Sequence, residues 1–154
     1  MIKPKSQIKH GIHLLKSFSR KPMKEQFLYL EATLGLAISK IVILFFPFRF
    51  IAKLLGKHMK ESPFNDVGNI EEIRLISKSI HTMSCHLPWE CKCLVQAITA
   101  KKMLDRRQTE NTLYLGLKKE NKNHLEAHAW VRTGQQIVTG DHQLQYYTVV
   151  STFF

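Results

Sequence analysis

A cysteine in the second half of the chain stands where a helix could activate it. Cys93 opens the stretch CLVQAITAKKMLDRR, whose apolar spacing predicts a helix beginning near Cys91 or Cys93. A thiol at a helix N-terminus is close to the positive end of the helix dipole, which lowers the thiol pKa and favours the nucleophilic thiolate. Backbone N–H groups at the same end could hold an oxyanion. Cys93 is therefore a candidate nucleophile.

A histidine and an aspartate follow in the stretch LEAHAWVRTGQQIVTGD, which predicts two strands joined by a tight turn. If the turn is Thr133–Gly134, His128 pairs with Thr139 and Asp141 pairs with Glu126. His128 and Asp141 are then diagonal neighbours on one face of the sheet. The aspartate could accept the imidazole Nδ1–H and orient the ring, as in a catalytic triad. A structural histidine in the core explains the same residue, and both interpretations stay open on the residues alone.

A metal site is a rival use of the cysteines. Soft donor atoms are concentrated in one short segment, at His81, Cys85, His86, Cys91 and Cys93. Their spacing contains neither a C-x2-C nor an H-x3-H pair, and no second pair follows at zinc-finger distance. We therefore expect no metal and no other cofactor. Three closely spaced cysteines without a secretory signal peptide favour reduced thiols and a cytoplasmic location.

Composition limits the classes of protein that the chain can belong to. It has 154 residues, 44% of them hydrophobic, and a formal net charge of +11, so we expect a single domain over residues 1–154 with an acidic partner. The lysines are scattered without a repeated basic–aromatic pattern, and no nucleic-acid partner is expected. The longest apolar stretch, IVILFFPF at residues 41–48, is too short to cross a bilayer, which needs about 20 residues. A buried helix end explains it, and peripheral membrane contact is the alternative.

The elements that must position these residues begin with helices over residues 1–65. Pro22 starts a helix that we expect to run to about Phe46. Its apolar residues recur every three or four positions, at Phe27, Leu30, Leu34, Ile38 and Ile41. Pro47 interrupts this pattern and starts a second helix, whose inward-facing residues should be Phe50, Ile51, Leu54 and Leu55.

Residues 66–154 should form the part that carries the chemistry. Asn69 and Glu72 resemble a capping box at the start of a third helix, and the helix with Cys93 follows. The period then changes to two, which predicts four strands, at TLYLGLKK, near residues 127–131, at QIVTG and at QYYTVVSTFF. Helices followed by a small antiparallel sheet make the predicted fold class α+β.

Taken together, these motifs resemble the leader peptidases of lasso-peptide biosynthesis. These are the stand-alone peptidase half of the lasso B protein, in the transglutaminase-like superfamily of cysteine peptidases. The resemblance covers residues 24–154 and includes an N-terminal apolar helix with its PFR break. It is carried by CLVQAITAKKMLDRR, LYLGL, AHAWVRTGQQIVTGD and YYTVVSTF. It implies a transglutaminase/papain-like fold in which a cysteine-bearing helix packs on the sheet, with Cys93 as nucleophile, His128 as general base and acid, and Asp141 as orienter.

The resemblance also implies a function and partners. Family members cut the leader from a ribosomally made precursor peptide through a thioester, and an ATP-dependent macrolactam cyclase then uses the freed amine. A leader-recognition protein presents the leader, and recognition domains are rich in β-strand. We expect this chain to be helical from about residue 6, so the recognition protein should be a separate partner. Trp89 and Trp130 could line the leader groove or serve as aromatic anchors of the core.

Three further points stay open on the residues alone. A catalytically inactive leader-binding adaptor would keep the same fold, and a transglutaminase-type acyltransferase would share the acyl-enzyme. Cys91, two positions before Cys93, is a competing thiol if the helix begins one turn early. The basic residues Lys101, Lys102, Arg106 and Arg107 could hold an acidic leader, and a solvated helix face and helix end is the simpler expectation.

Overall fold

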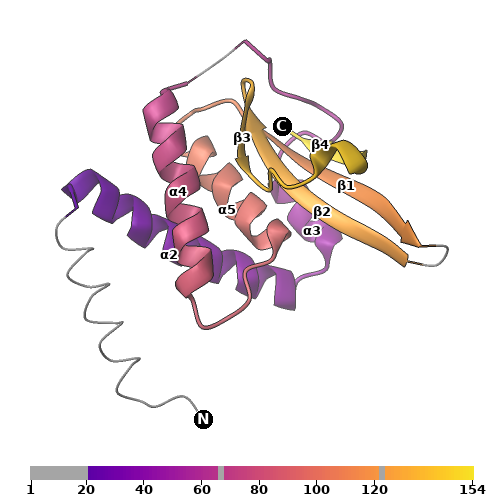
Figure 1. The fold of residues 1–154 in the computed structure, drawn as a ribbon, viewed down its shortest axis with the longest axis horizontal. Helices are drawn as coiled ribbons and strands as arrows, with labels where there is room; N and C mark the ends of the chain where they lie inside the picture. The colour runs from indigo at the N-terminus through magenta and orange to yellow at the C-terminus, as the bar shows by residue number, and fades with distance from the viewer. Residues whose placement is uncertain (1–20, 66–67, 122–123) are drawn as a thin grey trace.

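The computed structural model describes residues 21–65, 68–121 and 124–154. The helix expected from about residue 6 starts outside the described residues. Helices come first and an antiparallel four-stranded sheet follows (Figure 1), so the predicted α+β class is confirmed. The elements in chain order are α2 (Met23–Phe45), α3 (Phe48–Leu54), α4 (Ile70–His86), α5 (Cys93–Asp105), β1 (Thr112–Asn121), β2 (His124–Thr133), β3 (Gln136–Thr139), the 3-10 helix η1 (Leu144–Tyr146) and β4 (Thr148–Phe153).

The first two helices begin and end where the prolines predict. Pro22 is the N-cap of α2 and Pro47 is the N-cap of α3, because a proline needs no partner for a backbone N–H at a helix start. The face that α2 buries is formed by Leu28, Tyr29, Ala32, Leu36 and Ser39. The apolar set that predicted this helix lies on the other side, exposed to solvent.

The third helix also begins as predicted, since the Asn69 side chain accepts a hydrogen bond from the Glu72 backbone N–H at 3.2 Å. In α3 the prediction is half right. Ile51 and Leu55 are buried, whereas Phe50 and Leu54 are exposed. A helix of seven residues buries only one narrow face. Residues four positions apart, here Ile51 and Leu55, lie on that face.

The helix α5 lies between the other helices and the sheet (Figure 1), and it packs against α2, α4 and β2. Because neighbours surround it, the expected solvated basic face does not exist at Lys101. That side chain is 4% exposed, and its Nζ donates to Asn111 at 3.3 Å and lies 3.5 Å from Asp105. Burial lowers the pKa of Lys101.

The sheet has the strand order β3-β2-β1-β4 and all its neighbours are antiparallel. Its two faces have different roles. Leu113 and Val131 are paired neighbours in the hydrophobic core that α5 also joins. Tyr114 pairs with Trp130 and Gly116 pairs with His128, and side chains alternate along a strand. His128 therefore lies on the face turned away from α5.

Within the described residues, α2 is long and apolar enough to cross a membrane by length and composition. Core helices of water-soluble proteins meet the same criterion. One face of α2 packs on α4 and α5, with Leu36 and Ala32 fully buried. In this fold α2 is thus a helix with a packed inner side and an exposed outer side.

Candidate active site

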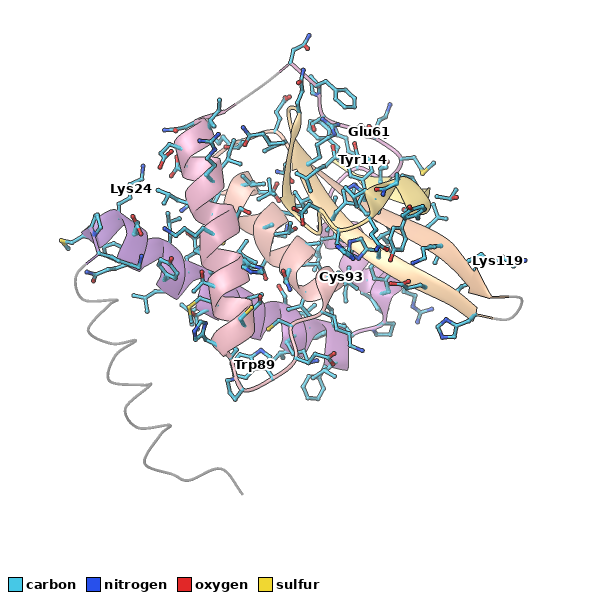
Figure 2. The ribbon with its side chains drawn as sticks, viewed as in Figure 1. Lys24, Glu61, Trp89, Cys93, Tyr114 and Lys119 are labelled. Carbon is cyan, nitrogen blue, oxygen red and sulfur yellow. The ribbon has the colours of Figure 1, made fainter. Side chains whose placement is uncertain are left out.

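Cys93 is the first residue of α5, at the helix end that points toward β2 (Figure 2). Lys92, the N-cap, makes no side-chain cap hydrogen bond, so it satisfies none of the free N–H groups of the first turn. The Gln96 amide holds the preceding chain by donating to the Cys91 carbonyl at 2.8 Å. Cys93 itself is half-buried. The predicted helix start is confirmed, and the thiol lies at the positive end of the dipole.

The other two thiols have different surroundings. Cys91 is buried in the hydrophobic core, and its Sγ donates to the Trp89 carbonyl at 3.7 Å. Burial raises the pKa of the Cys91 thiol, so its thiolate is disfavoured. Cys85 is exposed near the end of α4. Of the three, Cys93 alone combines partial exposure with a helix N-terminus.

The metal alternative was based on donors around the same cysteines. In the parts of the chain that the structure describes, no three His, Cys, Asp or Glu side chains gather closely enough to hold a metal ion. The five donors of that segment are all among the described residues. The geometry therefore offers no basis for a zinc site there.

The strand register next to His128 differs from the predicted one. Thr133 pairs with Gln136, so the turn is Gly134–Gln135, and Val131, not His128, pairs with Thr139. Gly134 has a φ of 50°, and a hairpin turn with a left-handed first residue favours glycine there over the β-branched Thr133. A bulge in the β2–β3 ladder beside Val131 shifts the register once more.

Asp141 consequently lies outside the sheet. The strand β3 ends at Thr139, and the pair of Asp141 with Glu126 does not form. Asp141 is exposed. Gly140, one residue earlier, has a φ of 74°, and a Cβ there would lie 2.5 Å from the Ala129 carbonyl oxygen. The chain therefore turns against β2 at a position where a side chain would clash.

His128 is oriented by this turn. Its Nε2–H donates to the Gly140 carbonyl at 2.9 Å, and the ring lies 4.9 Å from the Tyr147 ring and 6.0 Å from the Trp130 ring. The sequence predicts that Asp141 accepts from Nδ1, so both the nitrogen and the acceptor differ from the prediction. Because a carbonyl only accepts, Nε2 carries the proton in the neutral ring and Nδ1 is the basic nitrogen.

The structure does not bring the three predicted groups into contact with one another. In the described structure no hydrogen bond or ion pair links Cys93, His128 and Asp141 side chains. Cys93 packs with the core on the α5 side of the sheet, together with Ala129. His128 lies on the other face, at a point where the β2–β3 ladder has already ended. The edge of β2 beside His128 is therefore free of a paired strand.

The two tryptophans lie in different places. Trp130 shares the face of His128, as the alternation predicts, and stacks on Tyr114 with ring centroids 5.4 Å apart. Trp89 is in the loop between α4 and α5, away from the sheet (Figure 2). Its Nε1 is buried without a hydrogen-bond partner within the described residues. The structure thus brings Trp130 to His128 and leaves Trp89 apart.

Glu126 and Tyr147 are site residues that our reading of the sequence missed. The Tyr147 hydroxyl donates to Glu126 at 2.7 Å, and Lys118 donates to the same carboxylate at 3.0 Å. These hydrogen bonds lower the pKa of Glu126. Glu126 precedes His128 by two positions, so the strand alternation already placed it on that face. No sequence pattern indicated Tyr147, because its contact with Glu126 depends on the path of the chain from η1 into β4.

Comparison with known proteins identifies the superfamily. Residues 42–152 match a family model described as "Transglutaminase-like superfamily". No curated protein and no solved structure matches the chain significantly. This superfamily includes cysteine peptidases and acyltransferases. The matched segment contains Cys93, His128 and Asp141 and most of the described fold. The chain belongs to the transglutaminase-like superfamily.

Proposed function

We propose that the chain is a cysteine peptidase that removes the leader from a ribosomally made lasso-peptide precursor. The observation that carries the proposal is the position of Cys93 as a half-buried first residue of α5. The superfamily match supports it, and so does the resemblance of the motifs around Cys93 and His128 to lasso leader peptidases. The competing thiol Cys91 is buried and disfavoured as a thiolate.

In the proposed reaction Cys93 is the nucleophile and His128 is the general base and acid. The Cys93 thiol loses its proton to Nδ1 of His128, and the thiolate attacks the last carbonyl carbon of the leader. Free N–H groups of the first turn of α5 stabilise the oxyanion. His128 then gives its proton to the departing amine of the core peptide, leaving a thioester on Cys93. Water, deprotonated by His128, hydrolyses the thioester and releases the leader with a free carboxyl group.

The two groups lie on opposite faces of β2, so these steps require the turn at Gly140 to move. The bond from Nε2–H to the Gly140 carbonyl leaves Nδ1 as the basic nitrogen. No paired strand lies beside His128, but the turn at Gly140 packs against β2 there. The ring therefore reaches the α5 side only when this turn opens. Catalytic hydrogen bonds are often long without substrate and tighten in the substrate complex. Asp141 follows Gly140 directly, so its carboxylate can stabilise the imidazolium once the ring moves.

The proposed partners follow from the same function. A separate leader-recognition protein presents the precursor, and the macrolactam cyclase uses the amine that cleavage frees. The Trp130 side chain is only 6% exposed and stacks on Tyr114 beside His128, so it acts as an aromatic anchor behind His128. Trp89 lies in the loop that leads into α5, away from the sheet.

Mass spectrometry of a cleavage reaction tests the proposal. The protein is mixed with a candidate lasso-peptide precursor and with the recognition protein, as wild type and as Cys93→Ala, Cys91→Ala and Cys85→Ala. We expect free leader with every protein except Cys93→Ala. Cleavage that survives in Cys93→Ala would assign the nucleophile to another thiol.

The mass of the leader product distinguishes a peptidase from an acyltransferase and from a leader-binding adaptor. A peptidase releases the leader with a free carboxyl group, so its mass is that of the leader residues plus one water. A leader joined to an added amine indicates an acyltransferase acting through the same thioester. An intact precursor that nonetheless co-purifies with the wild-type protein indicates a leader-binding adaptor.

A further inference from the structure

The outer face of α2 is apolar although it is exposed to solvent. Of the exposed side chains of this helix, only Lys24 is charged. Phe27 is 65% exposed, Leu34 is 63% exposed and Ile38 is 57% exposed. We call the whole set the α2 stripe, and it consists of Met23, Phe27, Leu30, Leu34, Ile38, Ile41, Leu44 and Phe45.

The α2 stripe lies opposite the buried face of the same helix. Its members recur every three or four residues, and so do the buried residues, offset by about half a turn. Leu36 and Ala32, on the inner face, are fully buried. An ordinary surface helix of a water-soluble protein carries charged and polar residues where this stripe is. A contiguous exposed apolar face of this kind marks an interaction surface.

A groove runs along the stripe between α2 and α5. It has a volume of about 410 Å³, and its apolar wall includes Phe27, Leu30, Leu34 and Ile38. Two cations, Lys102 of α5 and Arg106 just after it, line the same groove. The Arg106 side chain is 69% exposed and lies 3.2 Å from Glu31. The surface thus combines apolar side chains with basic groups at its edge.

The carboxylates near the stripe are neutralised. Glu31 accepts from Arg107 at 2.7 Å, and Glu25 pairs with Lys21 at 3.2 Å. Between the start of α2 and the end of α3, the sequence contains these two acids and four basic residues, Lys24, Lys40, Arg49 and Lys53. The 22 residues that lead into α2 contain six Lys or Arg and no Asp or Glu. The sequence from α2 to α3 and the sequence before it therefore both carry net positive charge.

We propose that the α2 stripe docks on an anionic lipid bilayer, with α2 lying in the plane of the interface. Apolar side chains enter the boundary between headgroups and acyl chains, while lysines and arginines contact the anionic headgroups. Aromatic and aliphatic side chains on one face with basic residues beside them are the composition of such helices. The inner face keeps its packing on α4 and α5.

Charge and packing argue against the other occupants. A second copy of this chain also carries a net charge of +11 and would bring like charges together at the same stripe. A transmembrane position for α2 would remove Leu36 from the core and break the buried hydrogen bond between Ser39 and Thr99 at 3.1 Å. Docking in the interface keeps Leu36 in the core and leaves the hydrogen bond between Ser39 and Thr99 intact.

Vesicle flotation tests the proposal with the full chain. Vesicles of phosphatidylcholine with about one quarter phosphatidylglycerol should bind the wild type, and pure phosphatidylcholine vesicles should bind it weakly. Replacing Leu34→Gln and Ile38→Gln together should lower the binding constant at least about tenfold. A double variant at exposed apolar residues of the sheet, Leu125→Gln with Val150→Gln, should bind as the wild type does. Circular dichroism melts confirm that each variant is folded.

Every other outcome overturns the proposal. Wild-type protein that does not bind anionic vesicles contradicts the proposal. Equal binding by the two double variants also contradicts it. Protein that sediments as a dimer through the stripe and binds no vesicles assigns the surface to a second copy. Bound protein should be released by alkaline carbonate, and protein that resists this extraction indicates a spanning helix.

Discussion

At the scale of single residues, two thiols separated by one residue have opposite surroundings. Cys91 faces the core and donates to a backbone carbonyl, and burial raises its pKa. Cys93 is partly exposed at the tip of α5. Cys93 packs at the border of the core, whereas Cys91, just before the helix, lies inside it. The sequence predicted the start of α5 to within two residues.

His128 and Asp141 should differ in how much activity they control. We expect His128→Ala to lower kcat/KM for leader cleavage by about 10³-fold, since it removes the general base and acid. Asp141→Asn should lower it by about 10- to 100-fold, because the Gly140 carbonyl still holds Nε2–H. Steady-state cleavage kinetics measure both. Equal losses would mean that Asp141, not the Gly140 carbonyl, orients the ring.

At the scale of elements, most helices and strands could be predicted because each carries a local signal. Pro22 and Asn69 mark helix starts, and the change of period after Arg107 marks the sheet. The register between β2 and β3 could not be predicted, because it depends on which residue of the turn takes a positive φ and on a bulge. An error of one residue in that turn moved Asp141 out of the expected pair.

An ion-pair network ties three helices together. Arg107, just beyond α5, donates to Glu31 of α2 at 2.7 Å and to Glu72 of α4 at 3.2 Å. Burial alone would raise the pKa of Glu31, but the hydrogen bonds and charges of Arg107 and Arg106 lower it below the usual 4.5. A carboxyl whose folded pKa is depressed stabilises the fold above its unfolded pKa. That contribution is lost as the pH falls through the folded pKa.

Replacing Glu31→Gln should therefore destabilise the fold in a pH-dependent way. Urea unfolding at pH 7 should show a loss of about 1 to 2 kcal/mol, from the broken charged hydrogen bonds. The difference between wild type and variant should shrink as the pH falls below about 4.5. A difference that is the same at pH 7 and in acid would show that packing, not the charge of Glu31, stabilises this contact.

The face that carries His128 depends on one glycine. A Cβ at Gly116 would lie 2.8 Å from the Trp130 ring and 3.0 Å from the Tyr147 Cβ. Gly116→Ala should cost about 1 to 3 kcal/mol in the free energy of unfolding, because the ring must move. Chemical denaturation followed by tryptophan fluorescence measures it. Unchanged stability would mean that Trp130 has room to shift, and that it does not hold His128 in place.

At the scale of the whole molecule, the two proposals concern two different surfaces. Cys93 lies at the start of α5, and the α2 stripe lies on the outer side of the helical layer. The sequence pattern could not separate the two faces of α2, because both are apolar. Only the packing on α4 and α5 decides which face is buried.

The two surfaces should be separable by mutation. Leu34→Gln with Ile38→Gln should leave cleavage of a water-soluble precursor within about twofold of the wild type, since distant and independent sites act additively. The same assay on vesicle-bound protein provides the comparison. A large loss of activity in solution would mean that the stripe contacts the precursor or its recognition protein.

Alkylation of the three cysteines tests most directly whether Cys93 is the activated thiol. Iodoacetamide is added to the folded protein at neutral pH, and peptide mass spectrometry follows each cysteine over time. Exposure alone predicts that Cys85, the exposed thiol, reacts first. We predict instead that Cys93, at the N-terminus of α5, reacts about tenfold faster than Cys85. Fastest reaction at Cys85 would contradict the proposed mechanism.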